Sequence, residues 1–399
     1  TALWRLSLGY TSKLDANIIF MKVLNVVTVY FVVPFFFTDQ FAYFKKRGVE
    51  SHVSCSPDKR LAPWAHDHNF TPHEILLKRN ISPIQDVKTA RELIRLMRKG
   101  QFDIVCGHTP KGGLLSMIAA RWVGVKRRIY FRHGLVYETC KGLKRQLLMA
   151  TERIASWLAT DVVCVSPYLV ERSVKDHLTK KAKMHVLNMG SCNGIDAIGK
   201  FNPEHIDQII VTQLREKYGL QISDRVVGYT GRLVKDKGLV ELVEAFETLS
   251  KQYDDLKLLL VGPLEERDGL PDHIVDVIEK HPKIVYTGLV DDNIECYYYM
   301  MNYLVLCTHR EGLGTSILEA SSMGVPVLTT SHTGSRDAIV ENVTGVYVET
   351  NANSLGTALK QYIDDPMLAK QHGKAGREHM LQNFQQEIVW NEILKLYNA

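Results

Sequence analysis

From Val23 to Leu328 the chain alternates short apolar runs with longer stretches whose apolar residues recur at helical spacing. Parallel strands need long crossovers, which are usually helices, so this alternation predicts parallel sheets covered by helices. We predict two doubly wound α/β units, over residues 21–200 and 201–380, and a helix over residues 381–399 that packs back on them. Ligands of such sheets bind beyond the carboxyl ends of the strands, here in a cleft between the units.

Residues 18–37 are apolar enough to be taken for a signal peptide or a membrane segment. Four residues interrupt the stretch: Lys22, Asn25, Thr28 and Pro34. No small-residue cleavage site follows, so we predict a buried first strand over residues 23–33 that runs into a loop, and no membrane span. Met21 looks like a natural start, and residues 1–20 are expected to be an N-terminal extension without a role in the fold.

The composition, with 45% hydrophobic and 23% charged residues, is that of an ordinary globular protein. The seven cysteines form no Cys-x-x-Cys pair, which predicts free thiols in a reducing compartment such as the cytoplasm, with no disulfide framework and no zinc site. Charge is divided unevenly: residues 1–200 hold 31 Lys and Arg against 15 Asp and Glu, and residues 201–399 hold 18 against 29. A basic half can meet nucleic acid, anionic lipid or a phosphorylated substrate, or simply carry solvated lysines.

A predicted helix over residues 83–99 carries part of this basic excess. Its basic residues are Lys88, Arg91, Arg95, Arg98 and Lys99, with Leu93, Ile94, Leu96 and Met97 between them. Basic residues on a partly apolar helix suit an anionic membrane surface, and they equally suit a solvated outer face of the first domain. Peripheral contact with the inner face of the plasma membrane is therefore an open hypothesis.

Residues 311–319, Glu-Gly-Leu-Gly-Thr-Ser-Ile-Leu-Glu, join an apolar run to a helix-like one. A strand, a glycine-bearing turn and a helix N-terminus make an anion cradle, because the first helical N–H groups are unpaired and the helix dipole favours negative charge. We predict a phosphate there, with Glu311 and Glu319 accepting paired hydrogen bonds from sugar and ribose hydroxyls. Glu311 as a surface loop residue and Glu319 as an ordinary helix glutamate are the alternative.

A second strand-turn-helix junction, residues 231–238, places Arg232 and Lys237 at another helix N-terminus. Arg can bind phosphate oxygens in bidentate fashion and Lys supplies a point charge, so the two junctions together favour a diphosphate over a solvated loop. The sequence has neither a dinucleotide-binding Gly-x-Gly-x-x-Gly after the first strand nor a P-loop. It also lacks an Asp-x-Asp pair, so we predict that Arg, Lys and helix ends neutralise the diphosphate without Mg²⁺, Mn²⁺ or another cofactor.

Four segments resemble the retaining glycosyltransferases of family 4, which have the GT-B fold of two facing Rossmann-like domains. They are residues 231–238, 260–262, 287–292 and 311–327. The resemblance covers nearly the whole chain from Met21. It implies an acceptor-side N-terminal domain, a C-terminal domain that binds a nucleoside diphosphate sugar, and sugar transfer with retention of configuration.

The resemblance also implies roles for individual residues. Arg232 and Lys237 would bind the donor diphosphate, Glu319 the ribose hydroxyls, and Glu311 the transferred sugar. Other residues implied to border the donor are Gly231, Gly262, Leu289, Val290, Gly312, Leu313, Gly314 and Thr315. The departing nucleoside diphosphate would be stabilised by cations and helix ends, and its phosphate would act as base during front-face attack.

In the first half, Phe-Arg-His-Gly at residues 131–134 resembles the family's His-Gly element beside the donor sugar. This makes His133, with Glu311, a candidate catalytic residue, and a structural histidine is the alternative. Residues 108–113, His-Thr-Pro-Lys-Gly-Gly, resemble the branch that extends lipid-diphosphate-linked saccharides for capsule or O-antigen, and put His108 and Lys111 on the acceptor side. Glu152 matches a family glutamate of structural or functional role.

Two segments depart from the family pattern. The glycine pair expected after the first strand is replaced by Val-Pro-Phe-Phe-Phe at residues 33–37, which leaves the acceptor geometry open. The family's Gly-Gly-Ile-Pro-Glu appears as Thr-Gly-Ser-Arg-Asp at residues 333–337.

We therefore expect a cytoplasmic, metal-independent, retaining hexosyltransferase of bacterial type. Its donor would be a nucleoside diphosphate sugar, with UDP favoured, and its acceptor a polyprenyl-diphosphate-linked or other surface saccharide; we expect no nucleic-acid partner. Two alternatives stay open: a sugar-nucleotide epimerase on the same scaffold, and a non-catalytic protein that binds the membrane surface.

Overall fold

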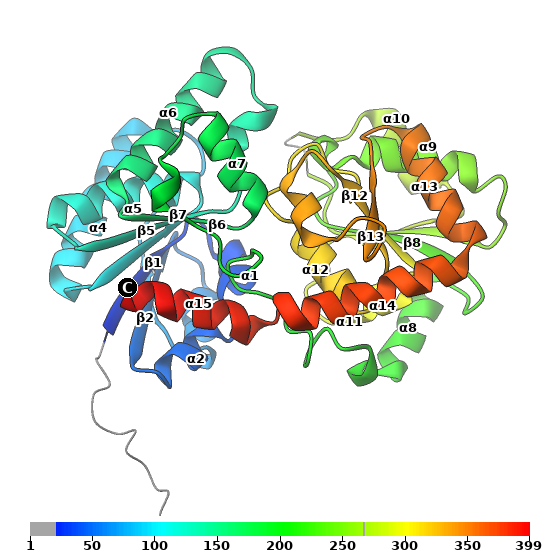
Figure 1. Ribbon diagram of the computed structural model, residues 1–399, viewed down its shortest axis with the longest axis horizontal. Coiled ribbons are helices and arrows are strands. Elements are labelled where there is room, and N and C mark those ends of the chain that lie inside the picture. The colour runs from blue at the N-terminus through cyan, green and yellow to red at the C-terminus, as the bar shows by residue number, and fades with distance from the viewer. Residues whose placement is uncertain (1–20, 266–267) are drawn as a thin grey trace, which may run out of the picture.

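The computed structural model describes residues 21–265 and 268–399, which form two α/β lobes with the C-terminal helices running along both (Figure 1). The extension predicted for residues 1–20 lies outside the described residues. No helix of the described chain is both long and apolar enough to span a membrane.

The N-terminal domain is built on a seven-stranded sheet in the order β3-β2-β1-β4-β5-β6-β7, with every neighbouring pair parallel. Its strands are β1 (Met21–Val26), β2 (Val49–Cys55), β3 (Thr71–Glu74), β4 (Ile104–His108), β5 (Arg127–Arg132), β6 (Asp161–Cys164) and β7 (Met184–His185). The strand order reverses between β1 and β4. The carboxyl ends of these two strands therefore form the switch point at which sheets of this class bind ligands.

Helices cover both faces of this sheet (Figure 1). They are α1 (Val33–Phe37), α2 (Gln40–Lys45), α3 (Leu61–Asp67), α4 (Pro83–Gly100), α5 (Pro110–Val123), α6 (Gly142–Leu158) and α7 (Pro167–Lys175). The middle helix α5 packs against both α4 and α6 on one face. Val23 and Leu24 belong to separate hydrophobic clusters, because successive side chains of β1 point to opposite faces and both faces are buried.

The C-terminal domain repeats this plan with a six-stranded parallel sheet in the order β10-β9-β8-β11-β12-β13. Its strands are β8 (Arg225–Thr230), β9 (Leu256–Val261), β10 (Ile284–Tyr286), β11 (Tyr303–Leu306), β12 (Val327–Thr330) and β13 (Gly345–Val348). Its helices are α8 (Gln208–Tyr218), α9 (Leu239–Leu249), α10 (Asp272–Lys280), α11 (Ile294–Met300), α12 (Thr315–Ser322), α13 (Ala352–Asp364) and α14 (Pro366–Asn383). The predicted fold class, two doubly wound parallel sheets, is confirmed, and the second switch point lies between β8 and β11.

The chain crosses between the domains at two places that touch each other. Ile195 donates its backbone N–H to the Phe384 carbonyl oxygen at 2.8 Å and accepts one from Gln386 at 3.2 Å. The last helix, α15 (Gln386–Asn398), then lies on the N-terminal domain against α2. Trp390 donates to the Asn193 side chain at 2.8 Å, which fixes the helix there. The lower face of the first sheet is thus completed by the last turns of the chain.

The prediction of one long first strand is wrong. β1 ends at Val26, and the residues predicted to continue it as strand and loop form a short 3-10 helix, Tyr30–Val32, and α1, Val33–Phe37. Pro34 sits in the first helical turn, where a missing N–H does no harm. The apolar residues that suggested a strand are used instead to cover the switch point of the first sheet.

Candidate functional site

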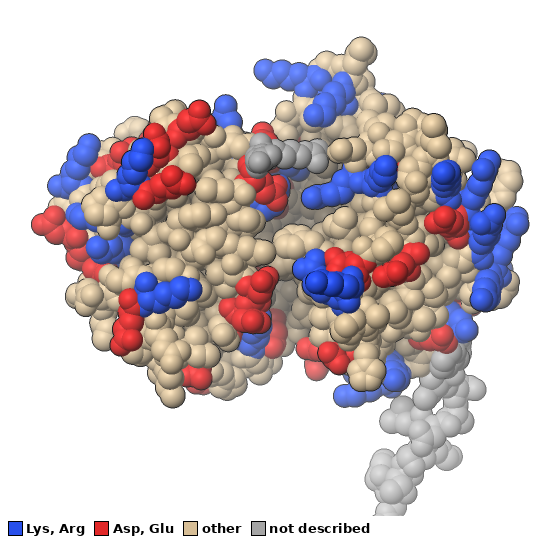
Figure 2. All heavy atoms as spheres, turned by 180° about the vertical axis from the view of Figure 1, so that it is seen from behind, with Lys and Arg blue, Asp and Glu red and all other residues tan. Residues whose placement is uncertain are grey.

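The turn after β11 brings the C-terminal domain into contact with the N-terminal one. A Cβ atom added at Gly312 would lie 1.9 Å from the His133 carbonyl oxygen, so the two backbones pass at a distance that only glycine permits. Leu313 is buried behind the turn, and Gly314, with φ of +85°, precedes the exposed first residue of α12, Thr315. The structure therefore sets Glu311 and the N-terminus of α12 opposite His133. The groove between the two lobes is visible in Figure 2.

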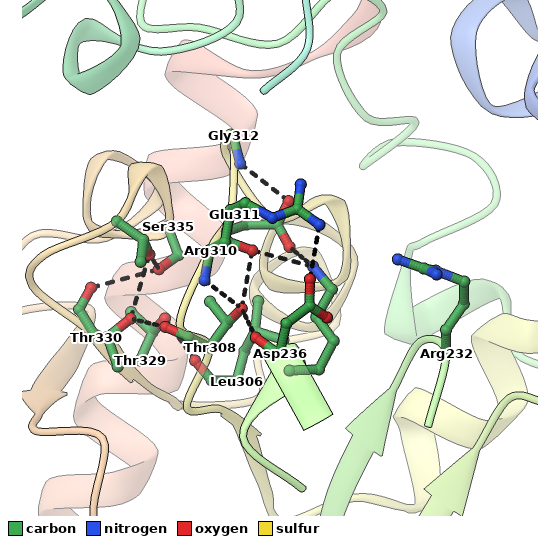
Figure 3. Close-up of polar contacts among 12 residues, drawn as sticks. Arg232, Asp236, Leu306, Thr308, Arg310, Glu311, Gly312, Thr329, Thr330 and Ser335 are labelled. Carbon is green, nitrogen blue, oxygen red and sulfur yellow. Dashed lines mark hydrogen bonds and ion pairs between the residues drawn. The ribbon is translucent and has the colours of Figure 1, made fainter. Parts of the chain in front are cut away.

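Glu311 forms an ion pair with Lys237, whose Nζ lies 2.5 Å from its Oε2. The Gly312 N–H donates to the other carboxylate oxygen at 3.0 Å (Figure 3). Burial acts to raise the pKa of Glu311, but Lys237 and these hydrogen bonds outweigh it and hold the pKa below its usual value. Glu311 is thus ionised at neutral pH and is paired with Lys237, which lies in the turn after β8.

A second ion pair supports this one from below. Arg310 donates to the Asp236 carboxylate at 2.6 Å, and the Thr308 hydroxyl donates to the Asp236 backbone oxygen at 3.1 Å (Figure 3). Asp236 is buried, so the pair locks the turn that carries Lys237 to the turn that carries Glu311. Sequence reasoning missed this pair, although both residues are direct neighbours of predicted site residues.

Arg232 approaches the same cluster from the end of β8. Its guanidinium is directed toward Asp236 and Glu311 without bonding to them (Figure 3), and it pairs with Glu265 at 2.8 Å. Gly231 and Gly262 bring the turns after β8 and β9 together, since a Cβ at Gly262 would lie 1.9 Å from the Gly231 carbonyl oxygen. Arg232 is one-third exposed and can exchange its carboxylate partner for a phosphate.

Glu319 is joined to the end of β8 through a tyrosine. Tyr298, on α11, donates its hydroxyl to the Glu319 carboxylate at 2.5 Å and receives a hydrogen bond from Thr230, the last residue of β8. Burial raises the pKa of Glu319 to about 7. Tyr298 thus ties Glu319 to Thr230, the residue before Gly231. Neither Tyr298 nor Thr230 was predicted from the sequence.

The remaining predicted donor residues follow β10. The backbone N–H of Gly262 donates to the Gly288 carbonyl oxygen at 3.0 Å, so the turn after β10 borders the turns already described. Leu289 is exposed and Val290 half-buried beyond it. Two apolar side chains next to Gly262 are suited to the face of a flat ring.

On the N-terminal side His133 ends a hydrogen-bonded chain. Its Nε2 lies 3.1 Å from Nδ1 of His108, and Nε2 of His108 lies 3.2 Å from the Asn25 side-chain oxygen. The Phe36 ring stacks on His133 with centroids 3.9 Å apart and planes 1° from parallel. Burial lowers the pKa of His133 to about 3 and that of His108 well below its usual value. Both rings are therefore neutral, and because Asn25 accepts from His108, His133 donates to His108 and keeps Nδ1 as an acceptor.

Two other predicted residues have structural partners. Lys111 pairs with Asp86 at 2.6 Å and donates to the Asn80 carbonyl oxygen, so an acceptor phosphate would compete with a carboxylate for it. Glu152 is buried and pairs with the fully buried Arg132 at 3.0 Å. Arg132 precedes His133, and the pair anchors the end of β5 that holds the histidine.

The predicted site residues thus fall into two groups facing one groove. Glu311, Lys237, Arg232 and Glu319 surround the switch point of the second sheet, and His133 and His108 surround that of the first. In residues 21–265 and 268–399 the structure gathers no set of three His, Cys, Asp or Glu side chains arranged to hold a metal.

Comparison with known proteins adds sequence evidence to this geometry. Residues 37–196 match the family described as Glycosyltransferase Family 4, and residues 211–379 match Glycosyl transferases group 1. The capsular polysaccharide biosynthesis glycosyltransferase CapM of Staphylococcus aureus is 34% identical over 95% of this chain and 97% of its own. The UDP-Gal:alpha-D-GlcNAc-diphosphoundecaprenol alpha-1,3-galactosyltransferase of Escherichia coli is 29% identical over 73% of this chain and 74% of its own.

The fold is shared with solved structures at lower identity. HepE of Anabaena, crystallised in complex with UDP, superimposes with a TM-score of 0.76 over 95% of this chain and 100% of its own, at 16% identity. The two matched families cover the two lobes, and a relative above 30% identity spans nearly the whole chain. The protein belongs to the family 4 type of glycosyltransferases with the GT-B fold.

Proposed function

We propose that this glycosyltransferase moves a sugar, with retention of anomeric configuration, from a UDP-linked donor to a saccharide carried on a lipid diphosphate during assembly of a surface polysaccharide. The observation that carries the proposal is the convergence of Lys237, Arg232, Glu311 and Glu319 at one switch point, across a groove from His133. Two relatives support the finer terms: the Staphylococcus aureus protein is named for capsule synthesis, and the Escherichia coli one for UDP-galactose and a diphosphoundecaprenol acceptor.

The diphosphate would lie between Arg232, Lys237 and the N-terminus of α12. Both cations are neutralised in this structure by carboxylates, Glu265 and Glu311. A bound diphosphate would replace Glu265 as the partner of Arg232 and would share Lys237 with Glu311. Cations and helix ends suffice to neutralise two phosphate charges, so we propose that transfer needs no divalent metal.

Lys237 would then lie between the two anions, and Glu311 would face the sugar rather than the phosphates, because its carboxylate would repel a phosphate placed next to it. In the transfer step the acceptor hydroxyl oxygen bonds to the anomeric carbon while the bond from that carbon to the β-phosphate oxygen breaks. The hydroxyl proton passes to the departing phosphate on the same face, which preserves the configuration. His133 offers its neutral Nδ1 to a sugar hydroxyl.

One experiment tests the proposal. Purified protein is incubated with UDP-sugars and a short lipid-diphosphate-linked saccharide, with and without EDTA, and the product linkage is determined by NMR. We expect a glycoside with the anomeric configuration of the donor and no loss of rate in EDTA. A product with inverted anomeric configuration would refute retention. A rate abolished by EDTA and restored by Mn²⁺ would refute transfer without a divalent metal.

The epimerase alternative is tested by the same mixture without acceptor. We expect the donor to be hydrolysed slowly or left intact and no epimeric sugar nucleotide to form. Binding of a UDP-sugar without turnover of any UDP-sugar tested would favour the non-catalytic alternative instead.

A further inference from the structure

Two phenylalanine rings stand exposed on the segment that follows β1. Phe31 is 47% and Phe35 56% exposed, and their ring centroids lie 5.3 Å apart, as expected for side chains one helical turn apart. The other side of the same turn is buried, since Val33 and Phe37 are 0% and 1% exposed. Phe31 and Phe35, which we call the phenylalanine pair, are therefore an exposed aromatic surface on a firmly packed base.

Contacts with distant parts of the chain hold this segment in place. Thr38 ends α1 with φ of +33°, and its hydroxyl accepts hydrogen bonds from the side chains of Asn193 and Gln386, each at 2.9 Å. Such a backbone conformation is unfavourable for a residue other than glycine and persists where surrounding contacts enforce it. Asn193 and Gln386 lie beside the two crossings between the domains, so the segment has a fixed position relative to both.

The phenylalanine pair borders the groove. Its segment leaves the carboxyl end of β1, at the switch point of the first sheet, and α1 lies on the side of the N-terminal lobe that faces the other lobe (Figure 1). Phe36, the next residue of α1, stacks on His133. The pair is thus continuous with the side chains that surround the first switch point.

A charged pair stands next to these rings. Arg60 donates two hydrogen bonds to the Asp58 carboxylate, at 2.9 and 2.8 Å, and its guanidinium lies over the ring of Tyr30, 4.7 Å from the centroid. The pKa of Arg60 is raised mainly by its hydrogen bonds to Asp58 and in smaller part by Asp291 of the C-terminal domain. The Arg60 side chain is 60% exposed, so it has N–H groups that a ligand in the groove can reach.

Aromatic rings beside a few polar groups are the usual lining of a site for a small polar molecule. The face of an aromatic ring is partly negative, and the C–H groups on one face of a pyranose are partly positive, so the two stack. The hydroxyls at the edge of the sugar then bond to charged side chains. The two rings of the phenylalanine pair are tilted by 53°, so one can lie flat against a sugar while the other contacts its edge. This arrangement fits one pyranose.

The position of the pair decides which pyranose fits. The proposed donor occupies the C-terminal domain, with its diphosphate at Lys237, its sugar at Glu311 and its base near Gly262. The phenylalanine pair lies on the opposite lobe, where the acceptor is expected. A polyprenyl chain would need apolar surface alone and would leave the polar groups of Asp58 and Arg60 without a role.

We propose that the phenylalanine pair, with Asp58 and Arg60 beside it, holds the terminal pyranose of the acceptor, stacked on one ring and hydrogen-bonded through its hydroxyls. This assignment rests on the proposed function, because it places a saccharide acceptor in the same groove. Residues 33–37 replace the glycine pair of the family pattern, so the subsite would distinguish the acceptor of this chain from those of relatives that keep the glycines.

The first test measures binding without turnover. Saturation-transfer NMR is recorded on the full chain with UDP and, in turn, the methyl glycosides of glucose, galactose and N-acetylglucosamine. We expect saturation of the ring C–H protons of at least one glycoside, and loss of this saturation in Phe31→Ala/Phe35→Ala. Absence of saturation from all three glycosides in the wild type, or equal saturation in the variant, would overturn the proposal.

The second test separates stacking from simple apolar contact, with the lipid-diphosphate-linked saccharide as acceptor. Phe31→Ala/Phe35→Ala should raise the acceptor KM about tenfold to a hundredfold and leave UDP affinity unchanged. Phe31→Tyr/Phe35→Tyr keeps the rings and should keep the wild-type KM, whereas Phe31→Leu/Phe35→Leu keeps apolar side chains without rings and should resemble the Ala variant. A Leu variant with wild-type KM would assign the surface to the lipid chain, and a loss of UDP affinity would assign it to the nucleotide; either result overturns the proposal.

The matched control is Trp122→Ala, which removes an aromatic side chain that is 73% exposed. Trp122 lies near the C-terminus of α5, at the edge of the same domain that is opposite to the carboxyl ends of the strands. Glycoside saturation and acceptor KM should not change in this variant. All variants change exposed residues, and unchanged thermal unfolding checks that they fold.

Failure of this proposal is distinguishable from failure of the proposed function. A protein that binds a glycoside through the phenylalanine pair but transfers no sugar refutes the function alone. A protein that transfers sugar with an acceptor KM unaffected by Phe31→Ala/Phe35→Ala refutes the subsite alone.

Discussion

The two switch points occupy the same place in two sheets of the same class, but the side chains around them differ in charge. Around β8 and β11 the side chains are ionised and paired, as in Lys237 with Glu311 and Arg310 with Asp236. Around β1 and β4 they are neutral and stacked, as in Phe36, His133 and His108. The same fold thus carries a charged, ion-paired cluster at one switch point and a neutral, stacked one at the other.

This difference runs against the overall charge of each half. Residues 201–399 hold more acidic than basic residues, and yet three cations gather at their switch point, each paired with a carboxylate: Arg232, Lys237 and Arg310. The basic residues 1–200 instead put neutral histidines at the first switch point. The net charge of a domain therefore says little about its site, because a few residues at the strand ends set the local chemistry. The excess positive charge of the first half is available for its outer surface instead.

The largest effect is expected from the buried ion pair of the first domain. Glu152→Ala would leave the fully buried Arg132 without its counterion and lower the free energy of unfolding by about 3–5 kcal/mol. Glu265→Ala, which breaks the partly exposed pair with Arg232, should cost about 1 kcal/mol or less. Urea unfolding measures the free energy of unfolding of both variants. Equal losses would show that the buried pair stabilises the fold no more than the partly exposed one.

The second effect concerns the charged switch point. Lys237→Ala should reduce kcat by about 10²–10³-fold, because a cation that stabilises a departing anion contributes roughly 2.7–4 kcal/mol. Lys235→Ala, an exposed lysine of the same turn, is the matched control and should keep full activity. Steady-state kinetics with the donor, and calorimetric binding of UDP, separate the loss of catalysis from the loss of binding. Full activity of Lys237→Ala would remove the diphosphate from this position.

The third effect concerns the neutral switch point. His133→Ala should lower kcat/KM about tenfold to a hundredfold, since it removes a buried hydrogen-bonding partner, an effect of about 1–3 kcal/mol. UDP affinity should not change. Because the pKa of His133 is lowered to about 3, its protonation should not shape the wild-type rate between pH 5 and pH 8. If the wild-type rate changes with pH in this range and the rate of the variant does not, the histidine titrates after all.

The smallest effect is a pH dependence of donor affinity. Burial raises the pKa of Glu319 to about 7, so the carboxylate is present above this pH and is protonated as the pH falls through it. If the ionised form binds the ribose hydroxyls, UDP affinity should fall about tenfold from pH 8 to pH 6, where about one-tenth of the groups remain ionised. Glu319→Gln should bind more weakly at pH 8 and show no such dependence. Parallel curves for the two proteins would assign the pH effect to another group.

The fold followed from the sequence because apolar periodicity reports local structure. Helix α4 spans Pro83–Gly100, one residue longer than the helix predicted over residues 83–99. The first strand was overestimated because valine and phenylalanine suit a strand and a buried helix equally. β3 was missed because it is a short edge strand with exposed ends and Pro72 inside it.

For the site, the sequence indicated the residues beside the glycine turns but not their partners. Tyr298 and Thr230 lie 68 positions apart, and Asn25 and His108 lie 83 apart, so no periodicity or spacing links them. Phe36 was noted only as a departure from the family pattern, and its stacking on His133 appears in three dimensions alone. Contacts of this kind depend on the packing of whole domains.

The placement of α15 has a consequence for how the protein folds while it is being translated. The helix that covers Tyr43 and Phe44 of the first domain is translated only after the entire second domain, so these two side chains stay uncovered while the N-terminal domain is still bound to the ribosome. The half that is made first is therefore the half that is finished last.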